Sequence, residues 1–230
     1  MKLPLSARLL ACCAFINPGD RVADIGCDHG YLGIFLLKNG IAESVIAADI
    51  NQMPLNSAVA NAQKFQVQDR MSFYLSDGAK KIPRDFDTLV CAGVGADTMI
   101  SILEESKWLA DSRYRLVLQC QSKTASLRSY LSENGWYIRN EQVLKDGRFL
   151  YTVMEILWQP GHILSPGQQY ITPALLKNPG PMVKDYYRQT LFKLERALRG
   201  QQEQADIHMK SAYQELLALT ESPEHTWLKE

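Results

Sequence analysis

The stretch Val22-Ala23-Asp24-Ile25-Gly26-Cys27-Asp28-His29-Gly30-Tyr31-Leu32 decides the fold. Its first four residues form a short apolar run interrupted by one acid, which is typical of a buried strand. Gly26 and Gly30 have no Cβ, so the chain can turn sharply there and a ligand can come close. A helix that starts near Tyr31 would point its free N–H groups over this turn. The stretch therefore predicts a nucleotide-binding strand–turn–helix junction.

The residues of this turn distinguish between classes of nucleotide. A dinucleotide site follows the pattern Gly-x-Gly-x-x-Gly and places a pyrophosphate on the helix N-terminus. Counted from Gly26, the second and third glycine positions hold Asp28 and Tyr31. A carboxylate would repel a pyrophosphate, but it suits the ammonium and sulfonium groups of S-adenosylmethionine. We therefore expect this cofactor, with Asp24 either accepting backbone N–H groups of the turn or binding the ammonium. A generic strand–turn–helix is the alternative.

Two further acids follow the next two apolar runs. Asp49 ends the run 44–49, and Asp77 comes two residues after the run 71–75. In a doubly wound sheet the second strand ends beside the first turn, so Asp49 would accept hydrogen bonds from the ribose hydroxyls. Asp77 would receive the exocyclic amine of the cofactor's adenine. Asp49 could also cap the helix that opens at Asn51. Three acids on three successive strand ends predict recognition of a nucleoside without phosphates.

Composition sets the limits of these interpretations. The chain has 230 residues, 46% of them hydrophobic, and a formal net charge of zero, so composition predicts neither nucleic-acid nor membrane binding. The sequence shows no secretory signal pattern and no run of membrane-spanning length. Five cysteines without a Cys-x-x-Cys pair argue against a disulfide framework or a zinc site, and no metal cluster is visible among the four histidines. We expect reduced, packed cysteines in a cytoplasmic protein.

The rest of the chain up to Trp158 alternates strand and helix patterns. A helix is expected over 5–16, and further helices over 30–39, 54–65, 97–109 and 124–134. Strands are expected over 21–25, 44–49, 71–76, 86–92, 114–120, 136–144 and 148–157. This alternation predicts an α/β fold with a doubly wound, Rossmann-like, seven-stranded sheet. The last two strands are joined by a turn containing Asp146-Gly147, which adds one antiparallel strand as in class I methyltransferases.

The turn after the fourth strand, Ala92-Gly93-Val94-Gly95, is expected to face the transferred methyl group in this architecture. Its glycines leave space and present backbone groups on which a flat base could lie. A tight turn into the next helix, with Asp97 as N-cap, is the alternative. The predicted cofactor-binding residues are Asp24, Gly26, Cys27, Asp28, Gly30, Asp49, Ile50, Asp77, Gly78 and Gly93.

Three groups of residues resemble the bacterial tRNA adenine-N1 methyltransferases that modify adenine 22 of the D-loop region. They are residues 24–32, residues 92–95, and the series Gln119-x-Gln121, Leu127-Arg128-x-x-Leu131, Gly135-Trp136-x-Ile138 and Glu141. The resemblance covers about residues 1–157 and implies an S-adenosylmethionine-dependent enzyme with tRNA as its partner. Two motifs depart from the family pattern, at three positions. Val94 and Ala96 stand where the family has Met and Gly, and Cys120 stands where it has Pro.

The implied reaction needs little acid–base chemistry. Adenine N1 has an in-plane lone pair, so alignment with the methyl group would supply most of the acceleration. A nearby carboxylate would stabilise the cationic product. The predicted catalytic residues are Asp28, His29 and Tyr31. Asp28 would bind the cofactor's amino group or the developing charge, and the other two would stack on or hydrogen-bond the base. Packing at a helix start is the alternative for these two.

The composition changes after Trp158, where a Pro/Gly-rich linker begins. We expect a catalytic domain over 1–158, and a linker with a helical hairpin over 159–230. The hairpin would pair helices 182–199 and 206–219 across a polar turn at 200–205. Helix 182–199 has five basic and two acidic residues, so Arg188, Lys193 and Arg196 could contact RNA phosphates. A solvated outer face is the alternative.

Other functions stay open at this point. The chain could methylate a small molecule, with the helical tail as a lid or a dimer contact. It could also bind the cofactor as an RNA or protein adaptor without turnover. A nicotinamide dehydrogenase fits least, because Asp28 and Tyr31 occupy positions where its phosphate turn needs glycine.

Overall fold

The computed structural model describes residues 3–201 and 207–228, and its core is one seven-stranded sheet of order β3-β2-β1-β4-β5-β7-β6. β7 runs antiparallel to both of its neighbours, and the other pairs are parallel. The predicted class I methyltransferase fold is therefore confirmed. The strands are β1 (Asp20–Ile25), β2 (Ala42–Asp49), β3 (Met71–Leu75), β4 (Thr88–Val94), β5 (Arg115–Cys120), β6 (Trp136–Asp146) and β7 (Phe149–Trp158).

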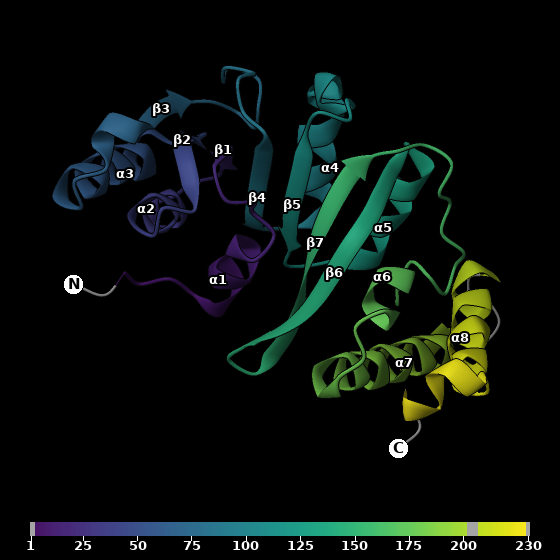
Figure 1. Cartoon of the computed structure of the whole chain (residues 1–230). Helices are drawn as coiled ribbons and strands as arrows, with labels where there is room; N and C mark the ends of the chain where they lie inside the picture. Colours follow the sequence, from purple (N-terminus) through teal and green to yellow (C-terminus); the bar gives the residue numbers. More distant parts are fainter. Residues whose placement is uncertain (1–2, 202–206, 229–230) are drawn as a thin grey trace.

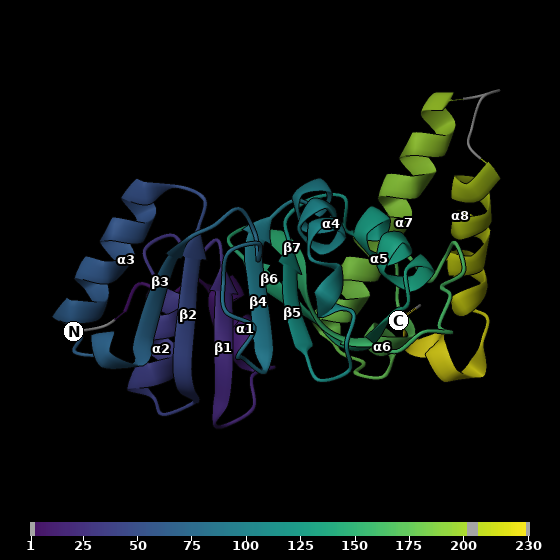
Figure 2. The same ribbon diagram turned by 90° about the horizontal axis from the view of Figure 1, so that it is seen from above.

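Helices cover both faces of the sheet (Figures 1 and 2). One face packs against α1 (Ala7–Cys13), α2 (Tyr31–Lys38) and α3 (Gln52–Lys64), and the other against α4 (Ala96–Glu105) and α5 (Thr124–Glu133). Short 3₁₀ turns, η1 (Gln68–Arg70) and η2 (Lys107–Leu109), precede β3 and β5. The N-cap of α4 is Gly95, so the prediction that Asp97 caps this helix was wrong.

Alternation along the strands builds two cores. In β1, Val22 packs with α1–α3, whereas Ala23 and Ile25 pack on the α4–α5 side. This is the period of two expected for a strand buried on both faces. Asp24 shares the face of Val22, which brings its carboxylate to the α1 side just where β1 ends.

The C-terminal segment adds α6 (Pro173–Leu176), α7 (Pro181–Gln201), α8 (Ile207–Leu219) and η3 (Pro223–Leu228). Figure 2 shows α7 and α8 beyond the β6–β7 end of the sheet, opposite α3. They share a small apolar core that includes Tyr187, Leu194 and Leu216, and this confirms the predicted helical hairpin. α7 continues to Gln201, so Gly200 and Gln201 belong to the helix and not to the predicted turn; residues 202–205 of that turn lie outside the described residues.

A buried ion pair joins this C-terminal segment to the sheet. Arg128 of α5 pairs with Glu141 of β6, and their side chains are 1% and 0% exposed. Arg128 Nη1 also donates to the carbonyl oxygens of Gln169 (3.1 Å) and Tyr170 (2.6 Å). Thr172 Oγ1 donates to Glu141 Oε2 at 2.7 Å. We call these residues the Arg128 cluster.

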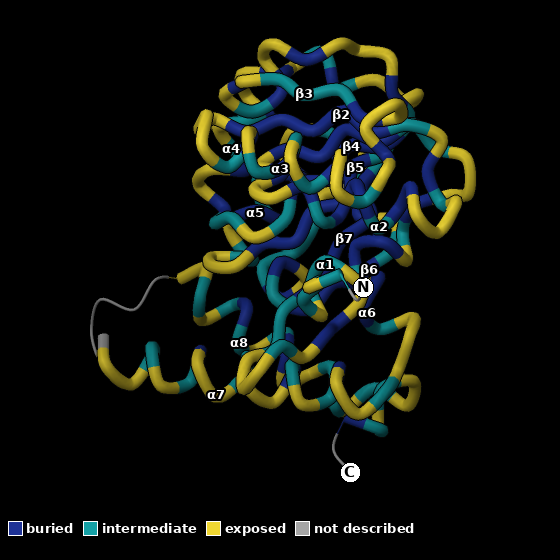
Figure 3. The backbone as a smooth tube through the Cα atoms, turned by 90° about the vertical axis from the view of Figure 1, so that its left-hand side faces the viewer, coloured by how far each residue is buried: buried dark blue, intermediate teal, exposed yellow. Residues whose placement is uncertain are grey.

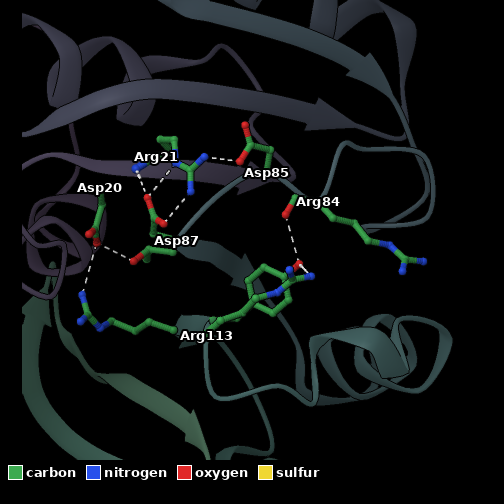
Figure 4. Close-up of polar contacts among 9 residues, drawn as sticks. Asp20, Arg21, Arg84, Asp85, Asp87 and Arg113 are labelled. Carbon is green, nitrogen blue, oxygen red and sulfur yellow. Dashed lines mark hydrogen bonds and ion pairs between the residues drawn. The ribbon is translucent and has the colours of Figure 1, made fainter.

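A second set of ion pairs lies at the amino ends of β1 and β4, at the edge opposite to the strand ends that carry Asp24 and Asp49 (Figure 4). Arg21 pairs with Asp85 and, through Nη2, with Asp87 Oδ1 at 2.9 Å. Asp20 accepts a hydrogen bond from Thr88 Oγ1 at 2.6 Å. These contacts tie the strand starts together. Within the described ranges, no helix combines the length and the apolar character needed to cross a bilayer.

Candidate active site

A cavity of about 800 Å³ opens where the parallel strands end. Nearly all of the predicted cofactor-binding and catalytic residues line it: Asp24, Gly26, Cys27, Asp28, His29, Tyr31, Asp49, Ile50, Asp77, Gly78 and Gly93. Its volume lies within the range of small-molecule sites. The structure thus brings together residues that are up to 69 positions apart in the sequence, from Asp24 to Gly93.

Backbone contacts shape the first turn. The N–H groups of Gly26 and Cys27 both donate to the carbonyl oxygen of Ala48, at 2.8 and 2.9 Å. The turn is therefore held by a backbone carbonyl of β2, and not by the Asp24 side chain as one of the two predicted roles required. Gly26 has φ +72°, and a Cβ placed on it would meet nothing within 4 Å, so its open side is available to a ligand.

Asp24 lies at the base of the cavity and is only 4% exposed. Its Oδ2 atom has no hydrogen-bond partner among the described residues. Burial, and to a lesser extent the charge of Asp49, raises the pKa of Asp24 to about 7. A buried carboxylate without a partner is well placed to receive a cationic group.

Asp49 connects the turn to α3. Its Oδ2 accepts the N–H of Asp28 at 3.1 Å, and its Oδ1 accepts the N–H of Asn51 at 2.8 Å. Asp28 has φ +50°, a conformation that Asp and Asn tolerate better than most residues. Asp49 therefore fixes the backbone at Asp28 and at Asn51. The N-cap of α3 is Asn51, with no side-chain cap hydrogen bond, so the alternative that Asp49 caps this helix was wrong.

The three predicted catalytic side chains lie at the cavity mouth. The side chains of Asp28 and His29 are 69% and 50% exposed, and His29 Nε2 is 3.5 Å from Asp28 Oδ1. The rings of His29 and Tyr31 lie 5.9 Å apart. These groups are accessible to an incoming substrate. Asp77 also lines the cavity and pairs with Lys80 at 2.6 Å.

Gly30 is not among the residues that line the cavity. It has φ +72°, and a Cβ added to it would lie 2.9 Å from Cβ of Ala58 on α3. Gly30 therefore allows α3 to pack closely against the turn, whereas the sequence predicted contact with the cofactor.

Sequence reasoning missed one wall of the cavity. Ser6, Arg8 and Leu9 come from the start of α1 and line the cavity, as do Thr98 and Ser101 of α4. Arg8 is the one Arg or Lys side chain among the described lining residues, which also include five aspartates. Its Nε donates to Asp146 at 2.7 Å, and its guanidinium lies 5.4 Å from the Tyr151 ring centroid. Only the amphipathic pattern of 5–16 marked this segment, and that pattern says nothing about a site.

Two thiols also line the cavity. Burial raises the pKa of Cys27, and it raises the pKa of Cys91 to about 12. Both are therefore neutral at physiological pH and unsuited to nucleophilic attack, because the thiolate is the reactive form.

The predicted RNA-binding residues lie elsewhere. Arg188, Lys193 and Arg196 are exposed on α7, and no described residue beyond Gln121 lines the cavity. The structure therefore separates the α7 residues from the cofactor-binding residues.

Comparisons with known proteins agree with this geometry. A protein of Bacillus subtilis named tRNA (adenine(22)-N(1))-methyltransferase is 30% identical over 154 residues, which make up 66% of this chain and 65% of that protein. The chain spans 61–65% of the length of three curated relatives that it matches.

Solved structures share the fold over nearly the whole chain. Sp1610 of Streptococcus pneumoniae, solved in complex with S-adenosyl-L-methionine, has a TM-score of 0.81 and 27% identity, and the match covers 93% of this chain and 99% of that one. The B. subtilis m1A22 tRNA methyltransferase TrmK, 24% identical, has a TM-score of 0.78 with full coverage of both chains.

The resemblance drawn from the motifs is thereby confirmed. A family model described as a methyltransferase domain matches residues 5–154. This range contains every residue that lines the cavity. The chain belongs to the methyltransferase domain family.

Proposed function

We propose that this protein transfers a methyl group from S-adenosylmethionine to N1 of an adenine in tRNA, with adenine 22 as the target. The observation that carries the proposal is the cavity at the strand ends, with its partnerless buried Asp24 and its excess of carboxylates. The names of the B. subtilis relative and of the ligand-bound S. pneumoniae structure support the target and the cofactor. The five unpaired, buried cysteines suit the cytoplasm, where such a substrate occurs.

The residues present fit the cofactor group by group. Asp24 would receive the ammonium, Asp49 the ribose hydroxyls, and Asp77 the adenine amine. Gly26 leaves room for the methionine part, because a Cβ there would occupy open space. Five aspartates facing one arginine disfavour a phosphate-bearing dinucleotide and suit a ligand with two positive centres.

The chain's own residues would then bind the cofactor and orient the target base against it. S-Adenosylmethionine, when bound, supplies an electrophilic methyl group on its sulfonium. His29 and Tyr31 would hold the target base at the cavity mouth, and Asp28 would stabilise positive charge on the ring. The base must first leave its stack in the folded RNA, which costs a few kcal/mol. We propose that Arg188, Lys193 and Arg196 offset this cost through phosphate contacts.

Mass spectrometry of nucleosides tests the proposal. Unmodified tRNA is treated with the purified protein and methyl-labelled cofactor, and the labelled nucleoside should be 1-methyladenosine. A metabolite extract treated in parallel should gain no label. Label in the metabolites alone would favour the small-molecule alternative. Binding of the cofactor without transfer to either pool would favour an adaptor.

Changing Asp28 tests the proposed catalytic role. Asp28→Asn keeps a residue that tolerates positive φ but removes the charge, so kcat should fall about tenfold or more. Asp28→Ala should show the same loss. Because the side chain is 69% exposed and Asn tolerates φ +50°, the free energy of unfolding of Asp28→Asn should change by less than about 1 kcal/mol. Unchanged turnover in both variants would remove Asp28 from the mechanism.

A further inference from the structure

The strand order places different residues at the two ends of the cavity, so the two ends are suited to different ligands. β1 lies between β2 and β4, so the acids after β2 and β3 are on one side of the first turn and the β4–β5 loops are on the other. The first side takes the nucleoside in the proposed function, on which the following steps rest. The loops after β4 and β5 are therefore left for the base that receives the methyl group.

Hydrogen bonds hold these two loops together. Gly93 N–H donates to Gln119 Oε1 (3.1 Å), Gln121 N–H to the Val94 carbonyl (2.9 Å), and Ala96 N–H to the Ser122 carbonyl (3.1 Å). Gln119 is 0% exposed, and its Nε2 donates to the Cys120 carbonyl at 3.0 Å. Its amide is thus occupied with structural contacts.

Gln119 and Gln121 both line the cavity, but they differ in exposure and in side-chain hydrogen bonding. The Gln121 side chain is exposed and lines the cavity. A Cβ placed on Gly93 would have Gln121 Nε2, at 3.5 Å, as its one neighbour within 4 Å, so the amide lies over the open side of Gly93. Among the described residues its side-chain amide has no hydrogen-bond partner. A donor and an acceptor are therefore free beside the flat backbone of the β4 turn.

The chemistry of the reaction determines which edge of the base such an amide could hydrogen-bond. N1 must face the sulfonium, so the edge of adenine that carries N1 cannot be bound by the protein. The other polar edge offers N7 as an acceptor and an N6–H as a donor, which match the NH₂ and the oxygen of one glutamine side chain. Guanine presents two acceptors there, N7 and O6, and would leave the amide oxygen unpaired.

We propose that Gln121 is the specificity-determining residue that recognises the target adenine through N7 and N6. The test uses a tRNA assembled with a single 7-deazaadenosine at the target position, compared with the same tRNA carrying adenosine. For the wild type, kcat/KM should be about tenfold lower on the 7-deaza tRNA, since one hydrogen bond is lost. Gln121→Leu should be slow on both tRNAs and show a ratio near one.

Gln63→Leu is the matched control, because Gln63 is exposed on α3 outside the cavity, and this variant should keep the wild-type ratio. Thermal unfolding of all three proteins verifies that they are folded. Equal wild-type rates on the two tRNAs, or a wild-type ratio in Gln121→Leu, would overturn the proposal for Gln121 alone. Failure of the wild type to methylate N1 of the normal tRNA would overturn the proposed function, and the role of Gln121 with it.

Discussion

Asp24 is a residue whose buried carboxylate is unfavourable in the free protein but could bind the cofactor's ammonium in the complex. Its carboxyl is buried, partnerless at Oδ2 and close to a second acid, and these conditions raise its pKa to about 7. An arriving ammonium would favour the ionised form and lower that pKa again. Stability and binding should therefore respond to pH in opposite directions.

Cofactor affinity should weaken as pH falls through about 7. Below that value Asp24 becomes protonated and loses its attraction for the ammonium, so the Kd of S-adenosylhomocysteine should rise by up to about tenfold per pH unit. Calorimetry between pH 5.5 and 8 measures this. 5′-Methylthioadenosine, which lacks the ammonium, should show a flat profile. Parallel profiles for the two ligands would contradict the role of Asp24.

The stability of the free protein should depend on pH in the direction opposite to that of cofactor affinity. The pKa of Asp24 is raised above its ordinary value of 3.8, so the folded state binds more protons than the unfolded state between that value and about 7. The contribution of Asp24 to the free energy of unfolding therefore falls as pH rises through this window. Asp24→Asn should remove this slope in urea unfolding without ligand. An identical slope in the variant would mean that other groups cause it.

At the scale of elements, α7 has two distinct sides. Val183, Tyr187 and Leu194 are buried against the sheet or α8, while the basic residues face outward. Figure 3 shows exposed segments alternating with intermediate and buried ones along this helix. Phe192 is 63% exposed and lies one turn from both Arg188 and Arg196. An exposed aromatic ring among arginines suits contact with an unpaired base as well as with phosphates.

Reversing charge on α7 should weaken binding of tRNA. The triple change Arg188→Glu, Lys193→Glu and Arg196→Glu should lower affinity and reduce the slope of log K against log salt by about two to three, because up to three phosphate contacts are lost. Filter binding across a salt series measures both. The control reverses three exposed lysines on other elements, Lys38, Lys64 and Lys107. Equal effects of the two triples would mean that α7 has no special part in binding.

Regular elements were predictable where their patterns were long. The strand and helix patterns gave all seven strands and the positions of α1–α5, α7 and α8, since alternating burial leaves a clear period in the residues. α6 and η3 were missed because four to six residues are too few to show a period. Asp97 was misplaced because Gly95, in extended backbone, ends the preceding turn and caps the helix.

The site was predictable in part, for a physical reason. Acids at strand ends converge in any parallel sheet, so Asp24, Asp49 and Asp77 could be placed together from the sequence. Contacts between distant segments could not be predicted from the sequence. Ala48 holds the first turn, Ala58 packs on Gly30, and Arg8 of α1 lines the cavity. Each of these depends on how distant segments pack, which local patterns do not encode.

At the scale of the whole molecule, the Arg128 cluster connects the sheet to the C-terminal segment through buried polar contacts. Arg128→Met should lower the free energy of unfolding by about 3–5 kcal/mol, because Glu141 would be left buried without its partner. Adding Glu141→Met should restore part of this loss. Urea unfolding measures both effects.

The exposed pair Arg199–Glu195 on α7 provides the matched control for this prediction. Arg199→Ala should cost well under 1 kcal/mol, since exposed pairs contribute little. A similar cost for Arg128→Met and Arg199→Ala would show that the buried pair does not hold the C-terminal segment in place.

The cavity wall stops at Gln121, while the basic side of α7 begins more than sixty residues later in a segment held by Arg128. On the proposed function, a substrate must bridge both places to gain both sets of contacts. A free nucleoside or a short hairpin would contact the cavity alone. Only a folded RNA of sufficient length would contact both the cavity and the basic side of α7. Selectivity for the size of the RNA would then arise from the spacing between the cavity and α7.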